Sequence, residues 1–305
     1  MITKNDLVKS LGQVINKNDK IIVIYSGISS FLNKFSFNKN LTSEILNIIE
    51  NFVSRKRTLI LPSFSAECFI KSKKFDLKNS IDNIGIIPKE ALKRKYYRTP
   101  QPLHSYLITG KDINPIKKLS HKTSWGEGSI LDFLSKNDAR ICTLGLPWNK
   151  GCAYLHRFEE NFQVPWRYFK TFNGKMYNGS KYVSVCKEIK YSLPKLYSKG
   201  EIYNYYPFIK HIKKAKTYKK NNHRDFNIES IKASCLNKIG EKLFLKNPWV
   251  IINKKKELLN WIKNKKVRDT ILGKFQPITG AFVTGNNSFY LYTGVEGQYG
   301  IGPIK

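Results

Sequence analysis

HKTSWGEGSILDFLSKNDARICTLGLPWNKGCAYLHRFEE, residues 121–160, contains two of the five histidines of this 305-residue chain, a Gly-x-Gly-Ser turn and a His-x-x-Glu pair. A glycine turn that opens a helix is able to hold phosphate, because backbone N–H groups meet there at the positive end of the helix dipole. A histidine with a carboxylate one helical turn away is able to take a proton. The stretch therefore indicates an active site that handles a phosphate-bearing donor.

The same stretch alternates between helical and extended patterns. Ser129-x-x-Asp132 has the form of a helix start, and the helix SILDFLSK is followed by a strand pattern, ARICTLGL. A turn, PWNKG, then leads into a second helix that would carry His156 and Glu159 on one face. This order of elements is typical of an α/β protein.

The first third of the chain repeats this alternation. Helical patterns near Asp6–Ile15 and Ser43–Val53 alternate with apolar runs at Lys20–Ser26 and Arg57–Ser63. Short apolar runs separated by helices predict βαβ units and a mostly parallel central sheet.

The second half changes character twice. Aromatic and β-branched residues between Val164 and Lys190, around two Asn-Gly pairs, predict an antiparallel hairpin added to the α/β fold. The last forty residues are rich in glycine and aromatic residues and poor in charge, so we interpret them as a small hairpin appendage or an oligomer contact. A domain over 1–265 with an appendage over 266–305 is the expected division, and a homodimer is the assembly considered.

Composition limits the class of protein. With 41% hydrophobic and 13% aromatic residues the chain can build a substantial core. No signal peptide is recognisable, and no apolar run approaches the ~20 residues that a membrane span needs, so we expect a cytoplasmic protein without a membrane partner. The five cysteines are widely spaced and never in a C-x-x-C pair, which indicates reduced thiols rather than disulfides or a zinc site.

The formal net charge of +32 has two readings. It favours anionic partners, including nucleic acid, through contacts with phosphate. An abundance of Lys, Asn, Ile, Phe and Tyr together is also what A/T-rich coding produces. Because no helix-turn-helix, RRM or zinc-finger spacing accompanies the charge, nucleic acid is not the expected partner. A basic nucleic-acid-binding protein remains the non-enzymatic alternative.

Four stretches in order resemble the aminoglycoside 3-N-acetyltransferase-like family of antibiotic acetyltransferases. They are IIVIYSGISSF (21–31), TLILPSFS (58–65), RTPQPLHSYLITG (98–110), and HKTSWGEGSIL (121–131) followed by LHRFEE (155–160). The resemblance covers most of residues 1–265. It implies a three-layer α/β/α fold, an N-acyltransferase activity, acetyl-CoA or another acyl-CoA as co-substrate, and no metal.

The chain departs from the family pattern at two positions. Tyr25 precedes Ser26 where the family usually has a histidine, and Ala153 stands beside Cys152 where the family usually offers a threonine three positions before His156. If that threonine hydroxyl normally helps to bind the thioester or the acceptor, its role is lost here or supplied by another residue.

His156 and Glu159 are the leading catalytic pair. Acyl transfer to an amine requires the amine to lose a proton, a histidine suits that step, and a carboxylate at i+3 fixes its tautomer. The resemblance adds His121, which opens the glycine turn and would contact the acceptor or position the donor; the alternative is a histidine that satisfies loop carbonyls. His104 is interpreted as structural or cofactor-adjacent.

The expected binding residues fall into two groups. Hydroxyls, a guanidinium and backbone donors suit the phosphates and amides of the donor. The predicted donor contacts are Ser26, Ser29, Arg98, Thr99, Ser105, Gly126, Glu127, Gly128 and Ser129. Trp125 and Trp148 are predicted to stack on a sugar face, although core packing is the more common fate of tryptophan.

Cys152 carries an alternative mechanism. On a continuous helix it would lie at i, i+4 from His156 and form a thiol–imidazole pair able to carry the acyl group. The resemblance implies direct transfer in a ternary complex instead.

The acceptor is inferred from charge. Aminoglycosides are polycations and need an acidic pocket, which a chain at +32 supplies only where acidity is sharply local. A nucleotide-linked amino sugar is an anion, and the positive field would favour both it and coenzyme A. We therefore predict acylation of a nucleotide-linked amino-deoxysugar in polysaccharide biosynthesis, with modification of aminoglycosides as the alternative.

Overall fold

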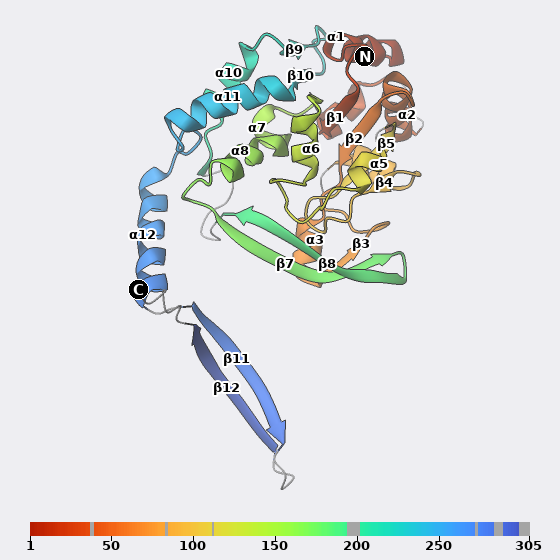
Figure 1. Cartoon of the computed structure of the whole chain (residues 1–305). Helices are drawn as coiled ribbons and strands as arrows, with labels where there is room; N and C mark the ends of the chain where they lie inside the picture. Colours follow the sequence, from red (N-terminus) through yellow and green to blue (C-terminus); the bar gives the residue numbers. More distant parts are fainter. Residues whose placement is uncertain are drawn as a thin grey trace. The chain divides into compact units, whose positions relative to one another are not determined.

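Two compact units make up the chain, and each is described by itself. The computed structural model describes residues 1–36, 40–82, 85–111, 113–193, 202–271, 274–283 and 289–298, and the units are Met1–Asn253 and Lys254–Lys305 (Figure 1). The functional division predicted at residue 265 stays a prediction. Over the described residues, no helix has the length and apolar character needed to cross a bilayer.

A mixed sheet forms the centre of the first unit. Over the described residues its seven strands run in the order β4-β5-β2-β1-β6-β10-β9. The strands are β1 (Ile21–Ser26), β2 (Thr58–Pro62), β4 (Tyr97–Arg98), β5 (Tyr106–Gly110), β6 (Arg140–Leu144), β9 (Lys219–Lys220) and β10 (Ile228–Lys232). The strands predicted at Lys20–Ser26 and Arg57–Ser63 are confirmed as β1 and β2.

The expectation of a mostly parallel sheet is corrected. Only β2, β1 and β6 pair in parallel, while β5 joins β2, β4 joins β5, β10 joins β6 and β9 joins β10 in antiparallel fashion. Between β2 and β5 the described residues form two seven-residue helices and two short strands rather than one crossover helix. An apolar run looks the same in either orientation, so the pattern alone did not reveal the reversal.

Helices cover both faces of the sheet, which confirms the three-layer α/β fold. One face packs against α1 (Lys4–Val14), α2 (Leu41–Val53) and α4 (Ile86–Leu92) through one large apolar cluster. The other layer contains α6 (Ile130–Lys136), α7 (Trp148–Gly151), α8 (His156–Asn161) and α11 (Ala233–Lys246) (Figure 1). The smaller helices are η1 (Ser29–Lys34), α3 (Ala66–Ser72), α5 (Ile113–Lys117), η2 (Ala153–Leu155) and α10 (Tyr206–Lys213).

The predicted antiparallel hairpin is confirmed as a second, smaller sheet. β7 (Tyr168–Asn178) pairs with β8 (Lys181–Ser192), and β3 (Lys74–Asp76) adds to β7 in parallel. Of the two Asn-Gly pairs, the second makes the turn, where Gly179 has a φ of +67° that favours glycine. The hairpin crosses the open side of the first unit and carries part of the site described below (Figure 1).

The described residues of the second unit form one helix and one hairpin. Helix α12 spans Lys255–Ile271, and β11 (Lys274–Val283) pairs with β12 (Phe289–Gln298) in antiparallel register. The hairpin falls within the glycine- and aromatic-rich tail, whose role as an appendage or an oligomer contact stays a prediction.

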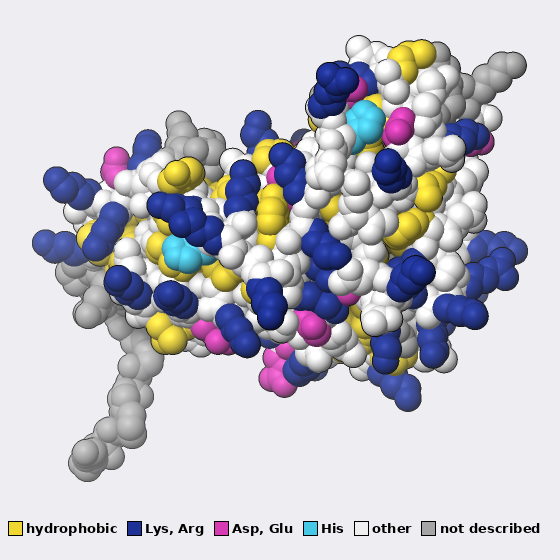
Figure 2. Space-filling view, turned by 90° about the horizontal axis from the view of Figure 1, so that it is seen from above, with side chains coloured by type: hydrophobic (Ala, Val, Ile, Leu, Met, Phe, Trp, Pro, Cys, Tyr) yellow, Lys and Arg dark blue, Asp and Glu magenta, His cyan; other side chains and the backbone are white. Residues whose placement is uncertain are grey.

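Positive charge is spread over the surface. Figure 2 shows Lys and Arg side chains distributed across the visible face, with few Asp and Glu among them. This distribution matches the formal net charge of +32.

Candidate active site

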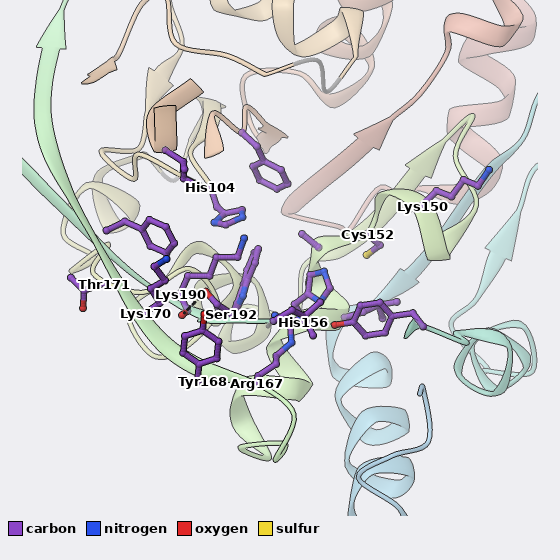
Figure 3. A pocket seen from close by; sticks show the side chains of 18 of the residues that line it. His104, Lys150, Cys152, His156, Arg167, Tyr168, Lys170, Thr171, Lys190 and Ser192 are labelled. Carbon is purple, nitrogen blue, oxygen red and sulfur yellow. Dashed lines mark hydrogen bonds between the residues drawn. The ribbon is translucent and has the colours of Figure 1, made fainter. Parts of the chain in front are cut away.

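The site lies in a cavity of about 1020 Å³, called here the main cavity, between the helical layer and the β7–β8 hairpin (Figure 3). Its lining comes from parts of 148–156, 167–173 and 190–193, together with Phe64, Ile70, Lys73, His104, Trp125, Tyr203 and Tyr205. The segment 148–156 follows β6, so the cavity is built beyond the carboxyl end of a central strand. Ligands of α/β sheets usually bind at such a place.

The structure brings the predicted catalytic pair together. His156 begins α8 and lines the cavity, while Glu159 in the same helix is wholly buried. Nδ1 of His156 lies 2.5 Å from Oε2 of Glu159. A carboxylate in this position accepts Nδ1–H and leaves Nε2 as the nitrogen able to take a proton.

Arg167 joins this pair, although no local motif in the sequence predicts its role. Its Nη2 lies 2.9 Å from Oε2 of Glu159 and 2.5 Å from the hydroxyl of Tyr203, and that hydroxyl donates to Oε1 of Glu159 at 2.7 Å. Nη1 donates to the carbonyl of Tyr191. Nη2 also lies 3.2 Å from Nδ1 of His156, but a guanidinium has no lone pair to accept a hydrogen bond, so Nδ1–H points to the carboxylate.

These contacts set the ionisation of Glu159. Burial alone opposes the charged form, but the charges of Arg167 and His156 and the hydrogen bonds of the site more than offset it and hold the pKa of Glu159 at about 2. The carboxylate is therefore ionised throughout the physiological range, and it orients and stabilises the imidazole rather than exchanging protons itself.

Both predicted tryptophans line the main cavity, and both are almost fully buried. The ring of Trp125 lies between His104 and His156, with centroid distances of 4.2 Å and 5.3 Å. Trp148 donates its indole N–H to Glu229 at 2.6 Å, which anchors it in the core. Stacking of either ring on a sugar stays a prediction.

A second cavity, called here the donor cavity, holds two of the predicted donor contacts. It measures about 390 Å³ and is lined by Tyr25, Ser26, Gly27, Ser29, Pro62, Phe64, Gly85, Pro88, Leu146 and Lys150. Phe64 and Lys150 line both cavities. The hydroxyl of Ser26 is buried and has no hydrogen-bond partner among the described residues, so it is available to an amide of a bound donor.

Three other predicted donor contacts line neither cavity. Arg98 donates to Oγ of Ser105 at 3.0 Å and to the carbonyls of Ser63 and Asp76 at 2.8 Å and 3.1 Å. Oγ1 of Thr99 accepts the backbone N–H of Tyr106, the first residue of β5, at 2.9 Å. Burial lowers the pKa of Arg98 to about 10. Arg98, Thr99 and Ser105 brace the chain around β5, and their donor contacts stay predictions.

The structure also keeps the glycine turn away from both cavities. Gly128 donates its N–H to Asp132 at 3.1 Å, and Ser129 donates its own to the carbonyl of Gly126 at 3.2 Å while capping α6 as predicted. Glu127 lines neither cavity. A phosphate-binding role for Gly126–Ser129 therefore has no support from this arrangement and stays a prediction.

His121 is likewise outside the cavities. It is buried, its Nε2 donates to the carbonyl of Ile116 at 2.9 Å, and burial lowers its pKa. This is the arrangement expected of a histidine that satisfies loop carbonyls. The structure does not bring His121 to the catalytic pair.

Cys152 does not have the geometry assumed for an acyl-carrying thiol. It lies between α7 and η2 with φ −92° and ψ 91°, so no continuous helix places it at i, i+4 from His156. Burial raises the pKa of its thiol to about 12. Since the thiolate is the nucleophile, this side chain is poorly suited to attack a thioester.

We expect direct transfer without an acyl-enzyme. Incubation with acetyl-CoA alone should leave Cys152 unacetylated by intact-mass and peptide mass spectrometry, because its thiol stays protonated near neutral pH. Initial velocities at varied donor and acceptor concentrations should give intersecting lines. Parallel lines together with a labelled Cys152 peptide would establish a ping-pong route instead.

Comparison with known proteins places this geometry in a family. Residues 29–244 match the family model described as aminoglycoside 3-N-acetyltransferase. The fold is similar to that of the YokD protein from Bacillus subtilis (15% identity, 81% of this chain, 100% of that chain, TM-score 0.62). It is also similar to aminoglycoside acetyltransferase AAC(3)-IIb (14%, 81% and 98%, TM-score 0.64) and to AAC-IIIb in a binary complex with CoASH (14%, 80% and 96%, TM-score 0.63).

No match was found among curated proteins. At these identities the solved structures establish the fold. The family model covers most of the chain, and the matched range includes His156 and Glu159. The chain belongs to the aminoglycoside 3-N-acetyltransferase family and is a CoA-dependent acyltransferase.

Proposed function

We propose that this protein transfers an acyl group, acetyl in the simplest case, from acyl-CoA to the amine of a nucleotide-linked amino-deoxysugar. The observation that carries the proposal is the charge of the main cavity. Lys73, Lys150, Arg167, Lys170 and Lys190 line it, and no Asp or Glu is among the described residues of its lining. The acidic residue nearest the chemistry, Glu159, lies behind His156 and is compensated by Arg167.

This charge discriminates between the two candidate acceptors. An aminoglycoside would bring several ammonium groups against the lysines, and each close pair of like charges costs about 1 kcal/mol in water and more in a cavity. A nucleoside diphosphate sugar brings two phosphate charges that lysines attract. The local acidity that an aminoglycoside would need is not found in the described lining of the cavity.

The proposed chemistry is a direct transfer. Nε2 of His156 takes the proton of the acceptor amine as the nitrogen attacks the acyl carbon, and Glu159 stabilises the imidazolium that forms. The donor cavity offers the hydroxyls of Ser26 and Ser29 to the pantetheine chain and Lys150 to a phosphate. The acyl-CoA itself supplies the activated carbonyl and the thiol leaving group.

Thiol release from acetyl-CoA tests the proposal. We expect kcat/KM to be at least about tenfold higher with a dTDP- or UDP-linked amino sugar than with a kanamycin-type aminoglycoside, which corresponds to about 1.4 kcal/mol of differential recognition. The product should carry the acyl group on its sugar nitrogen by mass spectrometry. Efficient turnover of the aminoglycoside alone would overturn the acceptor assignment.

Reversing one cavity charge should change acceptor choice. Lys170 lies in β7 with its ammonium group 5.1 Å from the ring of Phe172. In Lys170→Glu we expect the KM for the nucleotide sugar to rise about tenfold and the ratio of aminoglycoside to nucleotide-sugar turnover to increase. Lys175→Glu, on the same strand but outside the cavity lining, is the matched control.

The KM for acetyl-CoA separates the two anionic substrates in this experiment. If Lys170 contacts the acceptor, the KM for acetyl-CoA should stay within about threefold of that of the parent protein, which is less than 1 kcal/mol. A rise confined to the KM for acetyl-CoA would assign Lys170 to the donor and remove its support for an anionic acceptor.

Acetylation of aminoglycosides is the second candidate. The family model carries that description, and one similar solved structure is AAC-VIa bound to sisomicin (12% identity, 79% of this chain, 96% of that chain, TM-score 0.62). The direct comparison of acceptors described above decides between the two.

A further inference from the structure

A second histidine–carboxylate pair lines the main cavity. His104 precedes β5 and is labelled in Figure 3. Its Nδ1 lies 3.0 Å from Oε1 of Glu188 in β8. Both side chains are almost fully buried. Neither forms a recognisable motif with the other, because 84 positions separate them in the chain.

Glu188 is held firmly by other donors. Its Oε1 accepts the hydroxyl of Ser124 at 2.6 Å, and its Oε2 accepts the backbone N–H groups of Leu103 and His104 at 2.7 Å and 3.3 Å. This set fixes the carboxylate against the Nδ1 side of the imidazole. Nε2 is the ring nitrogen on the side away from this carboxylate, and His104 lines the main cavity.

The pair is able to hold a proton near neutral pH. Burial raises the pKa of Glu188 to about 7, although its hydrogen bonds and the charge of Lys190 act in the opposite direction. A buried carboxyl and an imidazole 3.0 Å apart bind their protons as one coupled unit. Such a pair is suited to giving a proton to a reacting group.

His104 lies opposite His156 across one aromatic ring. The indole of Trp125 separates them, and Phe64 packs edge-on against His104 at a centroid distance of 5.1 Å. Because Phe64 lines both cavities, His104 lies where the donor cavity meets the main cavity. Both histidines therefore line the main cavity and contact the same indole ring.

We propose that His104 is a second catalytic residue, the acid that protonates the departing sulfur of coenzyme A, and that Glu188 is its positioning residue. The amine nitrogen forms the new N–C bond and gives its proton to Nε2 of His156. The C–S bond breaks, its electron pair goes to sulfur, and Nε2–H of His104 supplies the proton that makes the thiol. Both imidazoles then return to their starting states by proton exchange with water.

Two separate groups suit this reaction because its two proton transfers occur at different atoms. The base must reach the acceptor nitrogen, and the acid must reach the donor sulfur. The inference rests on the transfer chemistry proposed for His156, but not on the identity of the acceptor. Any amine that the parent protein acylates is therefore a valid probe.

The decisive measurement is the pH dependence of kcat with saturating acetyl-CoA and such an amine. We expect a bell-shaped profile for the parent protein, falling at alkaline pH as His104 loses its proton. His104→Gln should lower kcat by about 10²-fold and remove the alkaline fall. Glu188→Gln should move that fall to lower pH, because the imidazolium loses its carboxylate partner.

The other groups around the pair do not mimic this signature. The titratable groups that face it are Lys190 and Cys186 of β8 and Tyr106 of β5. Burial raises the pKa of Cys186 to about 11 and raises that of Tyr106, so both stay neutral over the range of the experiment.

Two controls separate catalysis from structure. In His104→Gln the dissociation constant for coenzyme A should stay within about threefold of the parent value, which is less than 1 kcal/mol. His211 lies in α10 outside both cavities, so His211→Gln should keep the pH profile of the parent protein. A loss of kcat that leaves the alkaline fall in place, or that follows a loss of coenzyme A binding, would overturn the inference. Absence of turnover by the parent protein with every amine would instead count against the proposed function.

Discussion

Replacement of His156 by glutamine is expected to lower kcat by 10²–10⁴-fold, the contribution usual for a positioned general base. His156 begins α8, lines the main cavity and faces Glu159 through Nδ1 at 2.5 Å. Glutamine keeps a side-chain amide near Glu159 but has no nitrogen able to take a proton. The loss should therefore appear in kcat, while the dissociation constant for coenzyme A is retained.

Steady-state thiol release and equilibrium binding of coenzyme A measure the two quantities separately. Glu159→Gln should lower kcat as well, because the amide no longer stabilises the imidazolium. His211→Gln is the matched control, since His211 contacts the carbonyl of Pro207 in its own helix and lies outside the cavity lining. A His156→Gln protein that keeps more than about a tenth of the parent kcat would show that another group takes the proton.

The contact between His156 and Glu159 was predictable because its geometry is local. His156 and Glu159 are three positions apart, and any helix through them places the two side chains on one face. The same holds for the cap at Ser129, whose side chain accepts from Asp132 as the spacing predicts. Contacts between residues three positions apart can therefore be predicted wherever the helix that contains them forms.

The partners of that pair were not predictable in this way. Arg167 and Tyr203 come from positions 11 and 44 residues away along the chain from the groups they contact. The available signal was indirect: a buried glutamate needs a positive partner, and Arg167 follows a tryptophan in an otherwise apolar segment. Only the fold selects this arginine from the many in the chain.

The glycine turn illustrates the opposite case. Gly126–Ser129 does open a helix, as predicted, but its N–H groups bond to Asp132 and Gly126 within the same loop. A pattern that can hold phosphate is also one that caps a helix, and the sequence does not distinguish them. Likewise, His121 resembles a family position but points its Nε2 at the carbonyl of Ile116.

The net charge of the chain does not locate its basic residues. The net charge of +32 suggested an anionic acceptor, yet composition alone does not show where lysines gather. Their presence in the described lining of the main cavity depends on β7 and β8 crossing that side of the molecule. The hairpin was predictable, but its place against the helical layer was not.

Removal of Arg167 is expected to destabilise the fold by about 3–5 kcal/mol, the cost of leaving a buried charge without its partner. In Arg167→Met the carboxylate of Glu159 stays wholly buried and loses the guanidinium at 2.9 Å. Urea unfolding followed by tryptophan fluorescence measures the change. Lys93→Met is the control, because Lys93 pairs with Glu90 at 2.9 Å but is 74% exposed and should change stability by less than about 1 kcal/mol.

The double variant Arg167→Met/Glu159→Gln tests the cause of this loss. If the unpaired carboxylate is responsible, removing its charge should restore most of the stability without restoring activity.

The pH dependence of the free energy of unfolding tests the same cause, and its sign is defined. The pKa of Glu159 is about 2, below its ordinary value of 4.5, so in the parent protein this carboxylate stabilises the fold above pH 4.5 and that contribution is lost as the pH falls toward 2. Without Arg167 burial should dominate and raise the pKa of Glu159, so the acid-induced loss from this group should disappear. Equal acid sensitivity of the parent and Arg167→Met proteins would show that Glu159 is held ionised by the remaining contacts with His156 and Tyr203, and that Arg167 serves mainly to satisfy the carbonyl of Tyr191.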